Sequence, residues 1–393
     1  MNSWDSLCFV YVFAFVIIGF ALLTTKLLLS FSKKNPLTVK YNSIDGMRGY
    51  LALFVFLHHA AIWFYYFKTK NWTDPPLPLF DHFGKTSVSL FFMITSFLFF
   101  SKLIDNRNNP MDWVKLFVSR ILRLYPTYLF AMLVLFLLIG ILSSWKLIEP
   151  KSDVMTELFE WTTFTLFGNR HINNHSEVLI TAGVTWSLIY EWLFYFSLPL
   201  IGLVFFRIKT SFVTILITLV FAGLIIFKFP IQPIHLFSFA GGIAAAFALR
   251  SEKFCSLVSG KIFSAIAISL LFATVYFFHS PNEILPIAIS ALAFLIFAGG
   301  NDLFGILTLP VSKMLGQISY PIYLFHPLVL FITFKFILGF DFFSHGLSES
   351  YGMVISACMV ATVLLCFAIH YLIELPGMNA TKKVTDRLKG KNK

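Results

Sequence analysis

The feature that most constrains this chain is a succession of long apolar runs. A helix needs roughly 20 apolar residues to cross the hydrocarbon core of a bilayer, and eleven runs of about this length follow one another with polar segments between them. We therefore expect an all-α fold, a polytopic transmembrane helical bundle of about 11 spans. The expected spans cover residues 8–31, 49–67, 86–103, 126–145, 183–206, 211–227, 233–249, 262–278, 284–300, 314–334 and 353–373.

Composition supports a membrane protein over a soluble one. Of the 393 residues, 58% are hydrophobic and 12% are charged, whereas an ordinary soluble domain is about a quarter charged. The net charge of +11 fits basic residues that flank membrane spans, and no RNA-binding signature accompanies it. We expect membrane lipids as partners and no nucleic acid. Cys8, Cys255, Cys358 and Cys366 have neither CxxC nor metal-like spacing, so neither a disulfide framework nor a metal site is expected.

The distribution of lysine and arginine predicts the orientation of the spans. If the segment before the second span is cytoplasmic, alternation places 21 basic residues on the cytoplasmic side and eight outside. This bias follows the positive-inside rule. It puts the N-terminus outside and the C-terminus inside, and it makes residues 146–182 the only sizeable outer loop.

Ionisable side chains inside the apolar runs are costly and usually functional, and three of them are of particular interest. His59 lies eleven residues after Arg48, about 16 Å along a helix. Glu191 lies about eight residues into the fifth span, and His326 about twelve residues into the tenth. In a core about 30 Å thick, all three come near mid-depth, as a buried acid/base site would require.

A purely structural interpretation stays open at this point, because each group could instead hydrogen-bond a neighbouring helix. His58 also neighbours His59, and the two point about 100° apart around a helix. Depth alone does not decide between these two histidines.

A second group of side chains lies at the expected cytoplasmic face. Arg48 begins the second span, and Arg120 and Arg123 share a helix face just before the fourth. Arginine forms forked bonds to phosphate. The alternative is that these arginines anchor helix ends at anionic headgroups. Together with the mid-membrane histidines, they suggest a cytosolic ligand that carries phosphate.

Several motifs containing these residues resemble the membrane acyltransferase 3 family, typified by bacterial O-antigen acetylases. "DGMRGYLALFVFLHH" resembles its opening motif, in which ten residues separate an arginine from a histidine. This spacing selects Arg48 and His59. The same order of motifs continues through "SLFFMITSFLFF", "SRILRLYPTY", "TWSLIYEWLFY", "LGQISYPIYLFHP" and "YLIELPG".

The resemblance covers about residues 43–377. It divides the chain into an N-terminal transmembrane helix with a basic loop (1–40), a membrane acyltransferase domain (41–377) and a basic cytoplasmic tail (378–393). Thr95, Ser96 and Trp192 depart from the family pattern, which loosens the inference about substrate more than the inference about reaction.

The resemblance implies transfer of an acyl group, usually acetyl, from cytosolic acyl-CoA to a hydroxyl of a cell-surface glycan such as lipopolysaccharide O-antigen. The expected partners are acetyl-CoA as donor and a glycan or lipid-linked sugar as acceptor, at the bacterial inner membrane. His59 is expected to act as general base, Glu191 to orient or charge-balance a histidine, and Tyr323 or His326 to stabilise the oxyanion or shape the pocket. The expected site residues are His59, Glu191 and His326 for catalysis, Arg48, Arg120 and Arg123 for the donor, and Asp45, Trp186, Ser187 and Tyr323 in support.

Two other function classes remain as alternatives. A transporter or flippase of a lipid-linked sugar would use buried polar groups to bind cargo without an acyl donor, although the chain shows no repeat of two halves. A purely structural membrane subunit would leave the mid-depth ionisable residues unexplained.

Overall fold

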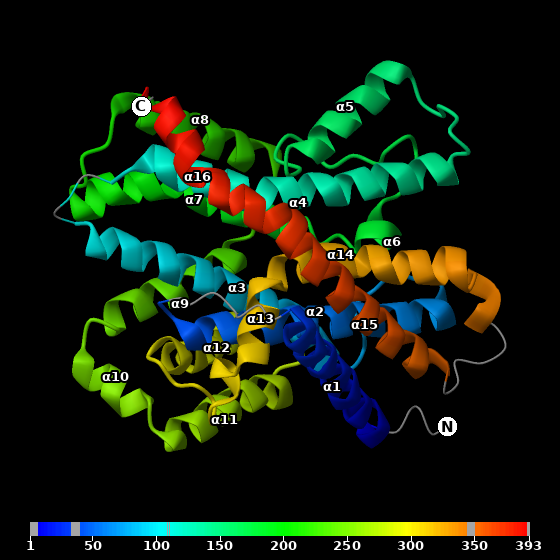
Figure 1. Cartoon of the computed structure of the whole chain (residues 1–393), viewed down its shortest axis with the longest axis horizontal. Helices are drawn as coiled ribbons and strands as arrows, with labels where there is room; N and C mark the ends of the chain where they lie inside the picture. Colours follow the sequence, from blue (N-terminus) through cyan, green and yellow to red (C-terminus); the bar gives the residue numbers. More distant parts are fainter. Residues whose placement is uncertain (1–6, 33–39, 108, 110, 344–349, 391–393) are drawn as a thin grey trace. The chain divides into compact units, whose positions relative to one another are not determined.

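A computed structural model describes residues 7–32, 40–107, 109, 111–343 and 350–390 of the chain. Within these ranges the fold is all-helical, with one isolated β-bridge between Ile172 and His175. Figure 1 shows the helices in chain order. The α-helices are α1 (Leu7–Ser32), α2 (Asn42–Thr69), α3 (Pro78–Asp105), α4 (Trp113–Leu142), α5 (Lys151–Thr162), α6 (Val178–Thr181), α7 (Trp186–Phe206), α8 (Phe212–Lys228), α9 (Pro233–Ala248), α10 (Glu252–Val258), α11 (Lys261–Phe277), α12 (Ile284–Ala298), α13 (Pro310–Gln317), α14 (Ser319–Ile332), α15 (Ser350–Ile369) and α16 (Leu375–Leu388).

Each of the eleven expected spans is helical over most of its length, although the tenth (314–334) crosses the break between α13 and α14. Among the described residues, seven helices are long and apolar enough to cross a membrane, or eight if α9 and α10, between which the chain bends by 111°, form one broken span. Three shorter apolar helices, α8, α11 and α12, make up the rest. The chain is therefore an integral membrane protein of helical type. Eleven spans and the outward N-terminus stay predictions; Lys33, Lys34, Lys391 and Lys393, which enter the orientation argument, lie outside the described residues.

Two helices begin earlier than the apolar runs indicate. The expected fourth span started at residue 126, but α4 already begins at Trp113, where the Asp112 side chain caps it by accepting from the Lys115 amide at 3.0 Å. Likewise α2 begins at Asn42 and not near residue 49. Charged residues and Pro126 interrupt the apolar pattern without ending the helix. Arg48, Arg120 and Arg123 accordingly lie within α2 and α4, inside the helices and before the apolar stretches of the expected spans.

The chain forms two compact units, and the first comprises Met1–Phe97 and Phe237–Phe367. Here α2 packs against α13, α14 and the short 3-10 helix η2 (Ile306–Thr308). The approach is close because two residues of α2 are glycines. A Cβ atom at Gly46 would collide with the Leu307 carbonyl, and one at Gly49 would lie 2.6 Å from the Leu315 Cβ. This packing holds the start of α2 in place.

The second unit comprises Leu98–Leu236 and Ala368–Lys393. Within it α16 packs along α4, and α7 packs against α8 (Figure 1). A Cβ atom at Gly377 would collide with the Leu122 carbonyl, so α16 and α4 meet backbone to backbone. At the other end of α16, Lys389 is ion-paired with Asp112. The basic tail expected from residue 378 is thus helical up to Leu388.

The expected outer loop is partly helical and is attached to α4 at Trp161. It contains α5 and α6, and the Tyr128 hydroxyl on α4 donates to the Trp161 carbonyl at 2.5 Å. The Trp161 indole in turn donates to the Arg170 carbonyl at 2.9 Å, and Arg170 is paired with Glu160 at 3.0 Å. These bonds connect α4, the C-terminal end of α5 and the chain at Arg170 through one buried tryptophan.

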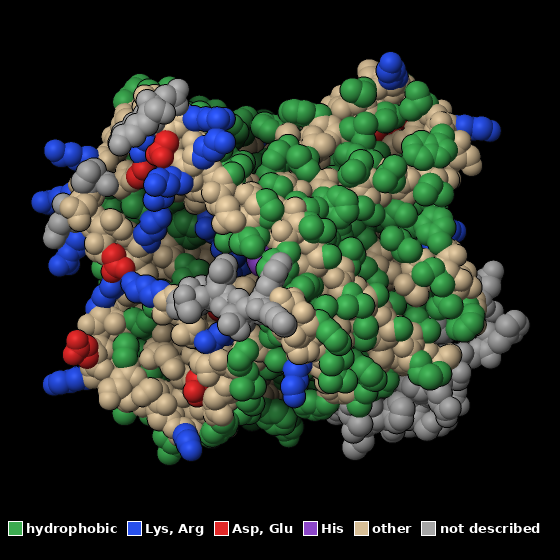
Figure 2. Space-filling model, in the orientation of Figure 1, with side chains coloured by type: hydrophobic (Ala, Val, Ile, Leu, Met, Phe, Trp, Pro, Cys, Tyr) green, Lys and Arg blue, Asp and Glu red, His purple; other side chains and the backbone are tan. Residues whose placement is uncertain are grey.

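Side chains on the surface divide by type. On the face drawn in Figure 2, apolar side chains cover much of α4, whereas lysine and arginine gather around the C-terminal end of α16. Large apolar residues are also exposed on α8 and α11, among them Phe227 and Phe272. An apolar belt with basic helix ends is what a lipid-embedded helix requires.

Candidate functional site

Two buried histidines meet in the core of the first unit. His59 comes from α2 and His326 from α14, and their side chains lie where these helices pack together. The Nδ1 atom of His59 is 2.9 Å from the Nε2 atom of His326. The two residues are 8% and 0% exposed. The structure thus brings His59 and His326, two of the three residues expected near mid-depth, into direct contact.

The hydrogen bonds determine which nitrogen carries each proton. The His326 Nδ1 atom lies 2.9 Å from the Ile322 carbonyl, which can only accept, so Nδ1 must donate. In neutral His326, Nε2 is then an acceptor, and His59 Nδ1 donates to it. His59 Nδ1 also lies 3.1 Å from the Val55 carbonyl, another acceptor. In neutral His59 the basic nitrogen is consequently Nε2.

His58 belongs to a different environment. Its Nδ1 atom donates to the Phe80 carbonyl at 2.8 Å, and its ring packs against Gly84, where a Cβ atom would lie 2.5 Å from the ring. The His58 and His59 ring centroids are 4.9 Å apart with an interplanar angle of 75°. The different partners of His58 and His59 thus distinguish the two histidines, which depth alone could not distinguish.

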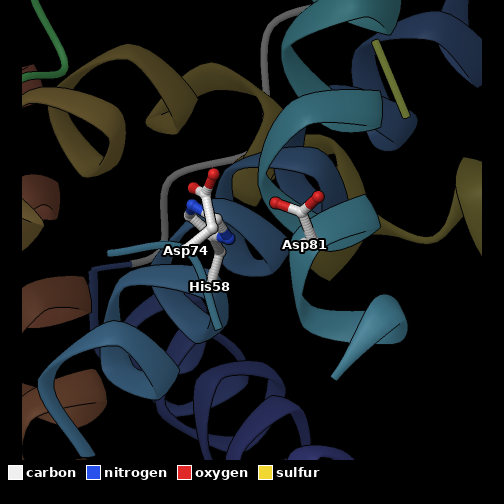
Figure 3. Close-up of side chains that lie close together, drawn as sticks. All are labelled: His58, Asp74 and Asp81. Carbon is white, nitrogen blue, oxygen red and sulfur yellow. The ribbon is translucent and has the colours of Figure 1, made fainter. Parts of the chain in front are cut away.

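His58, Asp74 and Asp81 form a cluster whose possible ligand atoms all lie within 4.8 Å of one another (Figure 3). An imidazole and two carboxylates could in principle hold a metal ion. However, the Lys85 ammonium already lies 2.7 Å from Asp74 and 2.8 Å from Asp81. A divalent ion would have to displace this ammonium group. We interpret the cluster as an ion-pair cluster that holds the loop between α2 and α3.

Arg48 and Asp45 lie near the start of α2, where the glycine contacts with α13 and η2 place them. Their side chains form an ion pair at 3.9 Å. Because Arg48 and His59 share one helix and are eleven residues apart, about 16 Å separates their positions along its axis. Tyr323 is buried on α14 one turn before His326, with ring centroids 6.4 Å apart.

A second set of expected residues gathers in the second unit. The Arg120 guanidinium stacks over the Phe99 ring at 5.2 Å, and Phe99 packs on Tyr195 with centroids 5.1 Å apart. The Tyr195 hydroxyl donates to Glu191 at 3.1 Å. The structure therefore brings Arg120 and Glu191 close to one tyrosine, which sequence analysis had not identified.

Two further residues of this unit were also missed as site residues. Glu374 and His370 lie on the π-helical turn between α15 and α16, where the Nδ1 atom of His370 is 2.8 Å from Glu374. The other Glu374 oxygen is 3.7 Å from the Nε atom of Arg123. The available signal was the "YLIELPG" motif, which contains this glutamate.

Trp186 and Ser187 have structural contacts at the start of α7. The Trp186 ring packs on His235 and Tyr190, with centroids 4.8 and 5.7 Å away. The Ser187 hydroxyl donates to the Val184 carbonyl at 3.3 Å. The expected site residues therefore divide between the units. Asp45, Arg48, His59, Tyr323 and His326 belong to the first, and Arg120, Arg123, Trp186, Ser187 and Glu191 to the second.

Comparison with known proteins identifies the family. The family model described as "Acyltransferase domain" matches residues 41–371, which is most of the chain. A Caenorhabditis elegans protein named "Nose resistant to fluoxetine protein 6" is 27% identical over 231 residues, covering 52% of this chain. The matched segment spans only 27% of that protein's length. No solved structure matches the chain.

Proposed function

The chain belongs to the acyltransferase domain family, and from this premise we propose that it is a membrane acyltransferase and propose which groups it transfers. The acyl group is acetyl, its donor is cytosolic acetyl-CoA, and its acceptor is a hydroxyl of a cell-surface glycan such as lipopolysaccharide O-antigen. The corresponding location is the bacterial inner membrane. This proposal combines the family with the basic residues and the buried histidines described above.

The hydrogen-bond chain through His326 to His59 is the observation that carries the proposal. It leaves the lone pair of neutral His59 on Nε2, the state that a general base needs. A sugar hydroxyl is a weak nucleophile until its proton is being removed, and a positioned base contributes typically about 10²–10⁴-fold. A buried histidine oriented in this way is therefore suited to activating a hydroxyl.

The proposed reaction balances without a metal or a redox partner. His59 Nε2 takes the proton of the acceptor hydroxyl while its oxygen attacks the thioester carbonyl. The resulting tetrahedral intermediate breaks its C–S bond and releases the ester, and the proton on His59 passes to the departing sulfur to give CoA thiol. A covalent acyl-histidine relay is the less favoured alternative.

The other residues have supporting roles in this proposal. His326 orients His59 as a neutral acceptor, and Tyr323 helps to stabilise the oxyanion or shapes the pocket. Glu191, expected to act on a histidine, hydrogen-bonds Tyr195, so we assign it to the polar cluster around the arginines. Arg48, Arg120 and Arg123 bind the phosphates of the donor through forked bonds.

Labelled acetyl-CoA tests the proposal. Membranes that contain the full chain are incubated with it, and label is measured in the glycan fraction. We expect His59→Ala to abolish labelling and His58→Ala, the matched neighbour, to keep most of it. Both proteins must accumulate equally in the membrane.

Near-normal labelling with the His59 variant would remove that residue from the mechanism. Label in another acceptor would overturn the glycan assignment. No transfer from acetyl-CoA to any acceptor, together with binding of a lipid-linked sugar, would favour the transporter alternative.

A further inference from the structure

Glu374 is a carboxylate without exposed surface. It lies on the π-helical turn His370–Glu374, where α15 continues into α16, and its exposed fraction is 0%. A single-turn π segment inside a helix is frequently found at a functional position. Burying an ionised carboxylate is costly unless it is paired and hydrogen-bonded, so the partners of Glu374 indicate its use.

Each Glu374 oxygen faces a different partner. Oε2 lies 2.8 Å from His370 Nδ1, which donates to it, and His370 is itself only 2% exposed. Oε1 lies 3.7 Å from the Nε atom of Arg123. It has no hydrogen-bond partner among the residues that the structure describes. The neighbouring guanidinium thus supplies the opposite charge without a direct short bond.

Glu374 faces only the Nε edge of the Arg123 guanidinium. Arginine has five N–H donors in a rigid fork, and an acceptor at Nε does not use the terminal amino groups. Those groups can form two parallel bonds to a phosphate. A carboxylate held at Nε would restrict the rotation of this long side chain, so less conformational entropy would be lost when a phosphate binds.

The element that carries Glu374 is held rigidly beside Arg123. Three residues after Glu374, Gly377 packs directly on the Leu122 carbonyl, because a Cβ atom there would collide with it. Leu122 is the residue before Arg123 on α4. The glutamate and the arginine are therefore presented by two backbones in contact.

We infer that Glu374 is a positioning residue for Arg123 in donor binding and that His370 holds Glu374 in place. This inference rests on the proposed role of Arg123 in binding donor phosphate. A competing interpretation predicts the opposite change in the donor KM. If Glu374 only neutralises Arg123, it competes with phosphate, and removing its charge should tighten donor binding.

Donor titrations on the purified full-length protein distinguish these cases. We expect Glu374→Gln to raise the KM for acetyl-CoA about tenfold, as would follow if a mispositioned Arg123 lost one of its bonds to the donor phosphate. The kcat and the acceptor KM should change little. His370→Gln, which keeps a donor for the carboxylate, should be near wild type, whereas His370→Leu should approach Glu374→Gln. Glu252→Gln, an exposed charge removal on α10, serves as the control.

The double variant Arg123→Lys/Glu374→Gln separates positioning from a general structural effect. If Glu374 acts only through Arg123, the double variant should have the donor KM of Arg123→Lys alone. Additive losses would contradict this.

The outcomes also separate this inference from the proposed function. A raised KM with Arg123→Lys but an unchanged or lowered one with Glu374→Gln overturns the positioning role alone. No change with either variant overturns the role of Arg123 in donor binding. If Glu374→Gln does not fold, the His370 pair decides: equal donor KM values for Gln and Leu would contradict the inference.

Discussion

The Nδ1 atom of His59 lies 2.9 Å from the Nε2 atom of His326, although the residues are 267 positions apart in the chain. Within the first unit, the side chain placed to orient the proposed base is thus the imidazole of His326, a role that sequence analysis had not assigned to it. A neutral acceptor can select the tautomer without adding a charge to an apolar interior, where an unpaired charge is costly.

His326 should control the tautomer of His59. His326→Phe removes the acceptor, so the Nδ1 proton of His59 loses its partner, and we expect kcat to fall at least about 100-fold. His326→Gln keeps a carbonyl oxygen that can accept, and it should stay within about tenfold of wild type. Steady-state kinetics on both variants provide the measurement. Equal losses would show that His326 does more than accept this bond.

Gly49 should be required for the packing of α2 on α13. A Cβ atom there would lie 2.6 Å from the Leu315 Cβ and 2.9 Å from the Gly316 amide. Gly49→Ala should therefore destabilise the protein by about 1–3 kcal/mol and lower activity through the neighbouring Arg48. Gly19→Ala is the control, because nothing lies within 4 Å of its Cβ position in α1. Thermal melts in detergent compare the two, and similar melting temperatures would contradict the packing argument.

Arg48 and Arg120 should prefer arginine to lysine if they hold phosphate. Lysine keeps the charge but loses the second bond of the fork. One bond to a charged group contributes roughly 1.5–3 kcal/mol, so the donor KM should rise about 10- to 150-fold. Donor titration compares each variant with Arg107→Lys, an exposed control near the end of α3. An unchanged donor KM in both variants would leave these arginines as topology determinants.

Single cysteines should report the predicted orientation. In a background without native cysteines, Ser152→Cys on α5 should react with a membrane-impermeant maleimide applied outside, because position 152 is exposed. Arg107→Cys and Lys383→Cys, at exposed positions, should react only after permeabilisation. External labelling of position 383 would invert the topology and place the basic end of α16 on the wrong side for a cytosolic donor.

Asp112 should make the junction of α4 and α16 sensitive to acid. Partial burial opposes its ionisation, but hydrogen bonds from Lys389 and the Lys115 amide outweigh this and hold the pKa of Asp112 below its usual value. Its stabilisation is therefore present above the unfolded pKa, about 3.9, and is lost as pH falls through the lower folded value. Asp112→Asn should flatten the decrease in thermal stability on acidification from about pH 5 to pH 3. Parallel curves for the two proteins would contradict this assignment.

Most of the helices could be predicted because membrane insertion depends on local composition. Each of the eleven apolar runs is helical in the structure, because in lipid the backbone N–H and C=O groups of such a run can be satisfied only by hydrogen bonds within the segment. The start of α4 was missed because Arg120, Arg123 and Pro126 interrupt the apolar pattern. The helix begins at the Asp112 cap and continues through these residues. Hydropathy reports neither the cap nor the backbone hydrogen bonds.

The sequence by itself determined the helical class, the family and the separation of Arg48 from His59, because eleven residues on one helix give a definite rise. Only the tertiary structure decided the partners of the site residues. His326 meets His59, Tyr195 meets Glu191, and Glu374 faces Arg123. The first and last of these pairs join residues far apart in the chain, and their geometry depends on how helices pack. A local pattern shows which face of a helix is polar, but it does not show which distant side chain lies opposite that face.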